Sequence, residues 1–393
     1  MFEKLAAQAP DSLLALIGAF RDDPRPEKID LGVGVYRDAE GRTPVFAAVK
    51  AAERRLLETQ DSKAYLGPEG NRAFARAVAP VVLGPLAGDE RILGVQTPGG
   101  TGALRLAAEL IAAADRKARV WLGTPSWPNH APLMKAAGLA IKTYRHLDPA
   151  TQSICFDEMI AALESAAPGD VVLLHGCCHN PTGADLSPAQ WDQVAELLAA
   201  RKLVPLLDLA YQGLGNGLEE DAAGLRQVLD KVDEALIAYS CDKNFGLYRE
   251  RVGMLFVRGR SGAEARIAFS NVLTLARTNW SMPPDHGAAA VALILEDDAL
   301  RADWRRELDA MRARIASVRA ELAAADPAFA ALGRQKGMFS MLPLSKETID
   351  RLRKEQAIYM AGSGRISVCG LTPGNLPRFV EMVRAALAAE GRP

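Results

Sequence analysis

No stretch of the 393-residue sequence stays apolar for the roughly 20 residues that a membrane-spanning helix requires, so we expect no membrane span. The N-terminal segment Met1–Lys4 does not lead from a basic region into a long apolar run, and we expect no signal peptide. A basic block is also lacking. With a formal net charge of -1, the chain gives no reason to expect binding to nucleic acid or to an anionic membrane.

Cysteine is scarce, and five cysteines in a chain of this length form no disulfide framework. A reducing cytoplasm is the simplest compartment for such a protein. Hydrophobic residues make up 49% and charged residues 24% of the sequence, which is the balance of a globular protein rather than of a disordered one. The length is sufficient for two domains.

Short β-rich segments alternate with helical ones between about residues 90 and 260. Several of the β-rich segments are apolar throughout, which is typical of strands buried on both faces. The predicted strands are Ile92–Gln96, Arg119–Leu122, Val171–Leu174, Leu203–Leu207, Leu236–Ser240 and Val252–Val257. Among the helices, the one ending at Arg201 has a typical start in Ser187 and Pro188. The alternation predicts a mostly parallel α/β sheet.

A long amphipathic helix follows, because apolar residues recur every three or four positions from Leu300 to Leu322 with charged residues between them. Beyond residue 330 the sequence has two more strand-like segments, Met338–Leu342 and Arg365–Val368, and a final helix near 377–389. We therefore expect a large central α/β domain and a smaller domain built from both chain ends.

Polar and reactive residues cluster directly after the predicted strands, where ligands bind in open α/β sheets. The glycine-rich turn Thr97–Gly102 fits either a phosphate site at a helix N-terminus or an ordinary tight turn. Later strand ends carry the strings S-W-P-N-H, H-G-C-C-H-N-P-T-G, D-L-A-Y-Q-G and K-N-F-G-L-Y-R-E-R-V-G. The two Cys and two His within 175–179 are too close in sequence to wrap a zinc ion, so we expect no metal site.

Together with G-S-G-R near the C-terminus, these strings resemble the class I aminotransferases of the aspartate and aromatic type, within fold type I of pyridoxal-phosphate enzymes. The resemblance runs from about Asp11 to the C-terminal helix. It implies a large domain with a mostly parallel seven-stranded sheet flanked by helices, and a smaller α+β domain. Accordingly we expect an N-terminal arm (1–12), a first small-domain segment (13–41), the large cofactor-binding domain (42–310) and a second small-domain segment (311–393).

The resemblance implies pyridoxal 5'-phosphate as cofactor and assigns roles around its ring. Lys243 matches the lysine that carries the cofactor as a Schiff base and later moves the substrate proton. Asp208 matches the carboxylate that keeps the ring nitrogen protonated. His175 matches a residue that supports Asp208 from behind.

Three further residues match groups on the other sides of the ring. Asn180 and Tyr211 match the donors to the ring's phenolate oxygen, and Trp127 matches the aromatic side chain stacked on the ring face. His130 matches a residue that supports Trp127. Trp127 and Asn180 are also expected to contact the substrate.

The cofactor phosphate is expected to bind Gly100, Thr101, Ser240 and Arg251, since a planar guanidinium suits a doubly charged phosphate. Tyr65 matches a tyrosine that reaches the phosphate in the neighbouring subunit. The resemblance therefore implies a homodimer with shared active sites.

Substrate groups match as well. Arg365 matches the arginine that holds the substrate α-carboxylate, and Gly34 matches the segment that closes over the substrate. Arg277 matches the arginine that crosses the dimer interface to meet a side-chain carboxylate. Met282 and Ala64 stand where aspartate-preferring relatives tend to carry asparagine, which favours aromatic donors.

Two residues depart from the family pattern. Gly99 stands where relatives can have serine, which loses at most one phosphate contact. Asp242 stands where a small residue, usually serine, is expected. A carboxylate that faced the site would raise the pKa of the Schiff base. Because adjacent side chains on a turn usually diverge, we expect Asp242 to point away.

The sequence thus predicts an aminotransferase that moves the amino group of an aromatic or acidic L-amino acid to 2-oxoglutarate. One alternative is an aspartate aminotransferase proper, in which the two apolar replacements are neutral packing changes. A second alternative is a β-lyase or decarboxylase of the same fold, which need not keep both substrate arginines, whereas Arg277 and Arg365 are both present here. A third is a non-catalytic protein of this fold, which need not keep the lysine and aspartate, whereas Lys243 and Asp208 are both present. The preferred donor and the pathway are left open.

Overall fold

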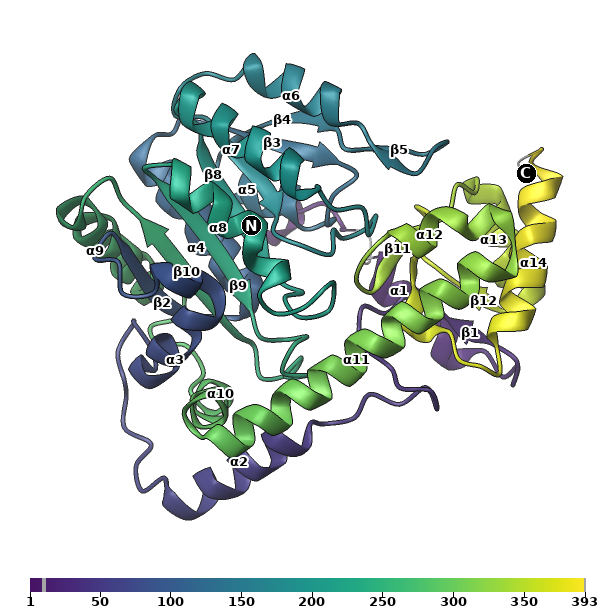
Figure 1. The fold of residues 1–393 in the computed structure, drawn as a ribbon, viewed down its shortest axis with the longest axis horizontal. Helices are drawn as coiled ribbons and strands as arrows, with labels where there is room; N and C mark the ends of the chain where they lie inside the picture. Colours follow the sequence, from purple (N-terminus) through teal and green to yellow (C-terminus); the bar gives the residue numbers. More distant parts are fainter. Residues whose placement is uncertain (9–11, 392–393) are drawn as a thin grey trace.

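A seven-stranded sheet forms the centre of the computed structural model, which describes residues 1–8 and 12–391 (Figure 1). The strand order is β2-β10-β9-β8-β7-β3-β4. The strands are β2 (Ile92–Pro98), β3 (Arg119–Thr124), β4 (Ala140–Arg145), β7 (Val171–His175), β8 (Val204–Leu209), β9 (Ala235–Ser240) and β10 (Val252–Arg258). Strand β10 is antiparallel to both of its partners, β2 and β9, and the other four pairings are parallel, so the predicted mostly parallel seven-stranded sheet is confirmed.

Helices cover both faces of this sheet, which explains why its strands are apolar throughout. Side chains of β7 alternate between two cores: Val172 and Leu174 pack in one, Val171 and Leu173 in the other. The first core takes in α6 (Phe156–Glu164), α7 (Pro188–Arg201) and α8 (Glu220–Lys231), and the second takes in α4 (Gly99–Ala114), α5 (His130–Ala136) and α9 (Gly262–Asn279).

The start of α7 follows from its sequence. The Ser187 side chain accepts a hydrogen bond from the Gln190 backbone, and the Gln190 side chain accepts one from the Ser187 backbone. This reciprocal capping box satisfies N–H groups that a helix end leaves without partners. The predicted helix is confirmed.

Strand β4 was absent from the sequence prediction. It lies at the edge of the sheet and pairs only with β3, so most of its side chains are partly or fully exposed. Its composition, A-I-K-T-Y-R, carries the polar residues that such an exposed edge permits, and it lacks the apolar run of the buried strands.

Helix α11 (Asp298–Ala325) carries the chain away from the sheet, as Figure 1 shows. It begins beside α2 (Ala47–Thr59) and α10 (His286–Glu296) and ends beside α12 (Ala330–Arg334). Its predicted apolar stripe is confirmed, because Trp304, Leu308, Ile315 and Leu322 are buried. The helix therefore links the sheet to the C-terminal part of the molecule.

The N-terminal and C-terminal segments meet at the far end of α11. Strand β1 (Ile29–Asp30) pairs in parallel with β12 (Ile358–Tyr359), and β11 (Phe339–Met341) pairs with β13 (Arg365–Ser367). The β1–β12 pairing joins residues more than 300 positions apart, as expected for a domain built from both chain ends. The domain boundaries themselves stay a prediction, and residues 9–11 of the expected arm lie outside the described chain.

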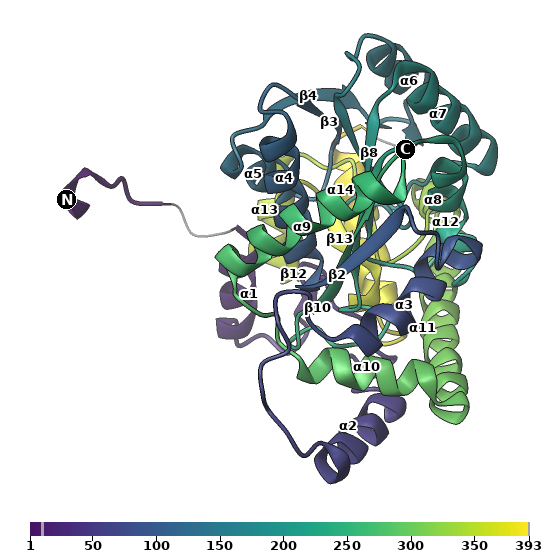
Figure 2. The ribbon, with the colours of Figure 1, turned by 90° about the vertical axis from the view of Figure 1, so that its left-hand side faces the viewer.

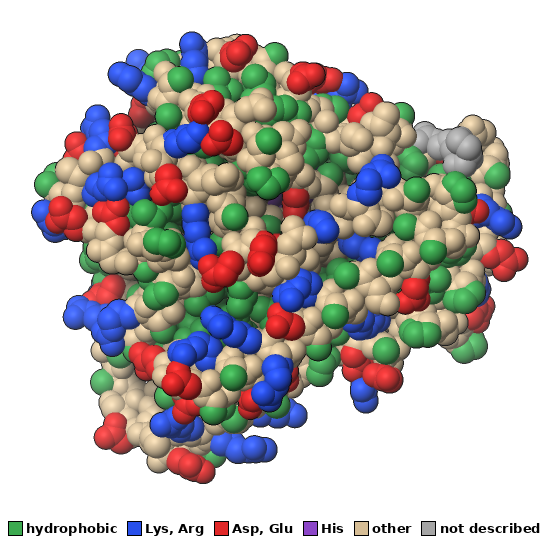
Figure 3. Space-filling model, viewed as in Figure 1, with side chains coloured by type: hydrophobic (Ala, Val, Ile, Leu, Met, Phe, Trp, Pro, Cys, Tyr) green, Lys and Arg blue, Asp and Glu red, His purple; other side chains and the backbone are tan. Residues whose placement is uncertain are grey.

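The remaining elements fill in around this frame. They are η1 (Phe2–Lys4), α1 (Ser12–Asp22), α3 (Arg72–Leu83), η2 (Gly84–Leu86), β5 (Leu147–Asp148), β6 (Ser153–Ile154), η3 (Pro327–Phe329), α13 (Lys346–Gln356), η4 (Val368–Gly370) and α14 (Leu376–Ala389). Residues 1–8 extend away from the body (Figure 2), and basic and acidic side chains are interspersed over the face in Figure 3. Within the described residues, no helix combines the length and apolarity that crossing a bilayer demands.

Candidate functional site

A cavity of about 260 Å³ opens where β8 and β9 end and α4 begins. Parallel strands place their carboxyl ends at one edge of the sheet, so residues far apart in the sequence meet there. The predicted site residues that line this cavity are Gly34, Gly100, Thr101, Trp127, Asn180, Asp208, Tyr211, Ser240, Lys243 and Arg251. Tyr65, Arg277 and Arg365 do not line it.

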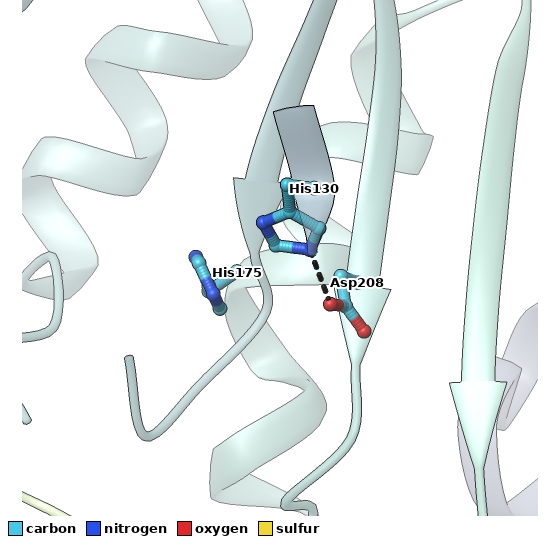
Figure 4. A group of neighbouring side chains, drawn as sticks. All are labelled: His130, His175 and Asp208. Atoms are coloured by element: carbon cyan, nitrogen blue, oxygen red, sulfur yellow. Dashed lines mark hydrogen bonds and ion pairs between the residues drawn. The ribbon is translucent and has the colours of Figure 1, made fainter. Parts of the chain in front are cut away.

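Asp208, the penultimate residue of β8, lines the cavity and is buried. Its Oδ2 lies 2.8 Å from Nε2 of His130, the first residue of α5 (Figure 4). Burial alone would raise the pKa of the Asp208 carboxyl. The His130 hydrogen bond, helped by the nearby charge of Lys243, outweighs burial and brings that pKa below its usual value. Asp208 is therefore a buried carboxylate that stays charged.

The histidine that supports Asp208 is not the one expected from the sequence. His175 was assigned this role, but its Nε2 is buried without a hydrogen-bond partner among the described residues. Figure 4 shows His175 beside His130, with ring centroids 5.0 Å apart. Burial lowers the pKa of His175 to about 3, so it is neutral. His130 also contacts the edge of Trp127 at 5.2 Å, as predicted, and so supports both residues.

Together, His130, His175 and Asp208 bring three potential metal-ligating atoms within 4.8 Å. His130 Nε2, the ring nitrogen on the side of Asp208, already forms a hydrogen bond with the Asp208 carboxylate and so is not free to bind a metal ion. Ser126 Oγ lies 2.8 Å from the other ring nitrogen of His130, which fixes the ring orientation. This arrangement is that of a histidine orienting a carboxylate.

Above the carboxylate, Asn180 and Tyr211 face the same space as Lys243. Asn180 Nδ2 donates to the Tyr211 hydroxyl at 3.2 Å, and Lys243 Nζ lies 5.0 Å from the centre of the Tyr211 ring. Asn180 Oδ1 is buried with no protein partner among the described residues. This amide oxygen only accepts, so it can take a donor from a bound substrate but not from a ring oxygen. The Asn180 amide nitrogen has a second N–H beside the Tyr211 hydroxyl, so these two residues can donate to a ring oxygen of a cofactor that Lys243 and Asp208 would hold.

The N-terminus of α4 forms one wall of the cavity. Backbone N–H groups in the first turn of a helix have no partner within the helix, and the helix dipole favours an anion there. Gly100 permits close packing in this turn, because a Cβ on it would lie 3.1 Å from Ser240 Cβ. With Thr101, Ser240 and Arg251, this wall has the donors and the positive charge that a phosphate group needs.

Asp242 does not point away from the site, contrary to the prediction. It lines the cavity beside Lys243, and its Oδ2 accepts a hydrogen bond from Nη1 of Arg251. The two groups form an ion pair in which the aspartate side chain is only 6% exposed. Asp242 faces the site because Arg251, nine residues further along the chain, returns to the same loop and pairs with the carboxylate.

Arg365 lies in a second cavity of about 830 Å³ next to the first, and Trp127 lines both. Its Nη2 donates to the Gly32 carbonyl at 2.7 Å, and its guanidinium stacks on the Phe339 ring at 4.7 Å. Its Nε is buried and has no partner among the described residues. Arg365 is thus held in place with a donor left for a carboxylate.

Tyr65 and Arg277 lie apart from both cavities within this chain. The Tyr65 side chain is 93% exposed, and Arg277 is exposed near the end of α9, where it donates to Ser281 Oγ. The two loops touch, because the Leu66 backbone N–H donates to Met282 Sδ at 3.1 Å. A large exposed tyrosine beside an exposed arginine is what a surface that meets a second subunit would present.

One polar residue of the cavity, Tyr248, has no role predicted from the sequence. Tyr248 lines the cavity, and its hydroxyl accepts a hydrogen bond from the Tyr36 backbone at 2.8 Å. It therefore ties the segment around Gly34 to the large sheet. The signal was present, since Tyr248 falls inside the quoted string K-N-F-G-L-Y, but a tyrosine after a glycine turn is usually core.

Comparison with known proteins places this chain among enzymes. The family described as "Aminotransferase class I and II" matches residues 26–383. The tyrosine aminotransferase of Rhizobium meliloti (strain 1021) is 58% identical over 94% of this chain and 96% of its own length, and the aspartate aminotransferase of Escherichia coli (strain K12) is 44% identical over 98% and 100%. The aromatic-amino-acid aminotransferase structure from Burkholderia pseudomallei, covalently bound to pyridoxal phosphate, superposes with a TM-score of 0.95 at 40% identity, over 98% of this chain and 99% of that one.

Proposed function

This chain belongs to the class I and II aminotransferases, and we propose that it moves the amino group of an aromatic or acidic L-amino acid to 2-oxoglutarate, with a lean toward aromatic donors. Pyridoxal 5'-phosphate is the cofactor. The observation that carries the proposal is the convergence of Lys243, Asp208, Tyr211 and Asn180 in one cavity beside the N-terminus of α4.

Around the ring, each residue has a distinct task. Bound pyridoxal phosphate supplies a ring that accepts the electron pair left when the substrate Cα loses its proton. Asp208, charged because His130 lowers its pKa, holds a proton on the ring nitrogen. Lys243 holds the cofactor aldehyde covalently and, when free, moves the Cα proton. Asn180 and Tyr211, which lie 3.2 Å apart, donate to the phenolate oxygen.

The phosphate is bound by the first turn of α4 at Gly100 and Thr101, by Ser240 and by Arg251. Three of these lie on rigid elements: α4 fixes the backbone donors, and Ser240 is the buried last residue of β9. Such fixed donors lose little freedom when they bind an anion. Tyr65 of the partner subunit completes this group.

The substrate is bound across the two cavities. Arg365 binds the α-carboxylate, which sets the bond at Cα that faces the ring, and Trp127, which lines both cavities, contacts the substrate. Gly34 marks the segment that closes over the substrate. Part of the second cavity's lining is apolar and includes Leu16, Pro132, Ile349 and Met360, which suits an aromatic side chain. This apolar surface supports the lean toward aromatic donors.

A second candidate is aspartate aminotransferase proper. Arg277 favours it, because a partner arginine in the site would pair with the side-chain carboxylate of aspartate. Met282 favours aromatic donors instead. It packs against the backbone next to Tyr65 and offers an apolar contact where the asparagine of aspartate-preferring relatives would hold Arg277. 2-Oxoglutarate is itself a dicarboxylate, so Arg277 has a role in either enzyme.

Assembly and location complete the proposal. We infer a homodimer with two shared sites, because the exposed Tyr65 and Arg277 lie outside the cavity that they are expected to complete. We also infer a cytoplasmic location, which the five free cysteines support because a reducing compartment keeps thiols unpaired.

Lys243→Ala is expected to lower turnover by about a thousandfold or more, because the variant lacks the amine that moves the proton. It should still bind pyridoxal phosphate but lose the visible absorbance of the lysine–cofactor bond. Absorbance spectra and steady-state rates check this, with Lys50→Ala on the exposed face of α2 as the control. Normal absorbance and full turnover in Lys243→Ala would refute the assignment.

Complementation between inactive subunits tests the shared sites. One variant carries Tyr65→Ala and Arg277→Ala, and the other carries Lys243→Ala. Random re-association should restore about a quarter of the wild-type activity, since about half of the dimers are hybrids with one intact site. Each variant re-associated alone is the control. A fully active monomer in sedimentation at assay concentration would exclude a shared site.

Donor preference follows from Arg277 and the apolar cavity. We expect comparable kcat/KM values for phenylalanine, tyrosine and aspartate, with the aromatic donors ahead. Arg277→Ala should lower kcat/KM for aspartate by about ten- to a hundredfold and leave that for phenylalanine within a few-fold, because only aspartate loses a charge-assisted contact. A wild-type preference for aspartate above about a hundredfold, or about 2.7 kcal/mol, contradicts the aromatic lean.

A further inference from the structure

The two residues that depart from the family pattern contact the same side chain. Arg251 Nη1 donates to Asp242 Oδ2 and, at 3.1 Å, to the Tyr248 carbonyl. On its other side the guanidinium lies against Gly99, where an added Cβ would come within 2.6 Å of Arg251 Nη2. Asp242 thus binds the Arg251 guanidinium, and the missing side chain at Gly99 leaves space for that guanidinium.

Asp242 is poorly satisfied by the protein alone. Its Oδ1 is buried and has no partner among the described residues, and its side chain is only 6% exposed. Its backbone N–H donates to Ser240 Oγ at 3.2 Å, so Asp242 contacts two of the proposed phosphate ligands. The carboxylate therefore lies among the residues that we propose to bind the phosphate.

Charge makes this position consequential. A phosphate ester carries about −1.5 to −2 charges at pH 7, and Arg251 is the only cationic side chain besides Lys243 among the described residues that line the cavity. The Asp242 carboxylate offsets the charge of Arg251, so this pair has no net positive charge to offer the phosphate, and its negative member would lie near the phosphate. Within a partly buried site, a like charge at short range costs far more than it does in water.

We propose that Asp242 lowers the affinity of this chain for the cofactor phosphate by competing for Arg251. Gly99 provides the space in which the guanidinium contacts both the carboxylate and the phosphate. The inference rests on the proposed role of Arg251 as a phosphate ligand. It assigns Asp242 a positioning role, acting through Arg251. The cofactor is then retained chiefly by its covalent bond to Lys243, and it exchanges readily whenever that bond is broken.

Pyridoxamine 5'-phosphate is the probe that isolates this effect. It carries an amine in place of the aldehyde, so it cannot bond to Lys243, and its affinity reports the non-covalent contacts alone. Equilibrium dialysis of the full chain should show at least about tenfold tighter binding in Asp242→Ser and Asp242→Asn, because the competing charge is gone. Pyridoxamine, which lacks the phosphate, should bind all variants within about twofold.

Glu250→Gln is the matched control, because it removes a carboxylate adjacent to Arg251 in the sequence for which no ion pair with Arg251 is found. It should change the dissociation constant by less than about twofold. A double-mutant cycle gives a second measurement: Gly99→Ala should weaken phosphate binding more in the wild-type background than in Asp242→Ser, where the guanidinium is free to shift. The strain of Ala at φ +69 enters both backgrounds and cancels.

Unchanged or weaker pyridoxamine phosphate binding in both Asp242 variants would overturn the inference, as would an additive cycle. Failure of the wild-type chain to bind pyridoxal phosphate at all would overturn the proposed function and this inference with it. The two failures are therefore distinct in the same set of measurements.

Discussion

The parallel pairing of β3, β7, β8 and β9 is the constraint on which the site depends. Parallel strands must all end at the same edge, and each crossover helix returns the chain to the opposite edge. The loops after these strands therefore converge, although their residues lie more than 100 positions apart. Because the strands are buried on both faces, packing fixes their registers. The positions of the polar residues at the strand ends are therefore fixed as well.

Electrostatics at the two ends of the cavity differ in kind. At the ring end, Asp208 is a buried carboxylate kept charged by one hydrogen bond from His130, and neutral His175 behind it adds no competing charge. At the phosphate end, Arg251 offers one cation, and Asp242 opposes it. The ring end thus has a carboxylate held in its charged form, whereas at the phosphate end the Arg251 guanidinium is already paired with a carboxylate.

Much of this could be predicted from the sequence, because apolar periodicity and polar strand ends are local signals. The mostly parallel sheet, α7, α11 and the clusters of polar residues at the strand ends were predicted in this way, whereas the roles of the individual cavity residues came from the family resemblance. The errors have a common cause, which is that they concern contacts between loops. Neither the choice of His130 over His175 nor the turn of Asp242 toward Arg251 follows from spacing, since each depends on how two separate loops pack. Strand β4 was not predicted, because a strand at an exposed sheet edge needs no apolar pattern.

The most direct test of the central claim is a single half-reaction. The cofactor-loaded chain is mixed with phenylalanine in the absence of any 2-oxo acid, and phenylpyruvate and ammonia are measured. If the site transfers the amino group to its own cofactor, roughly one equivalent of phenylpyruvate per subunit should form without free ammonia, and the reaction should then stop until 2-oxoglutarate is added. Continued turnover with release of ammonia or carbon dioxide, or no phenylpyruvate at all, would contradict the account.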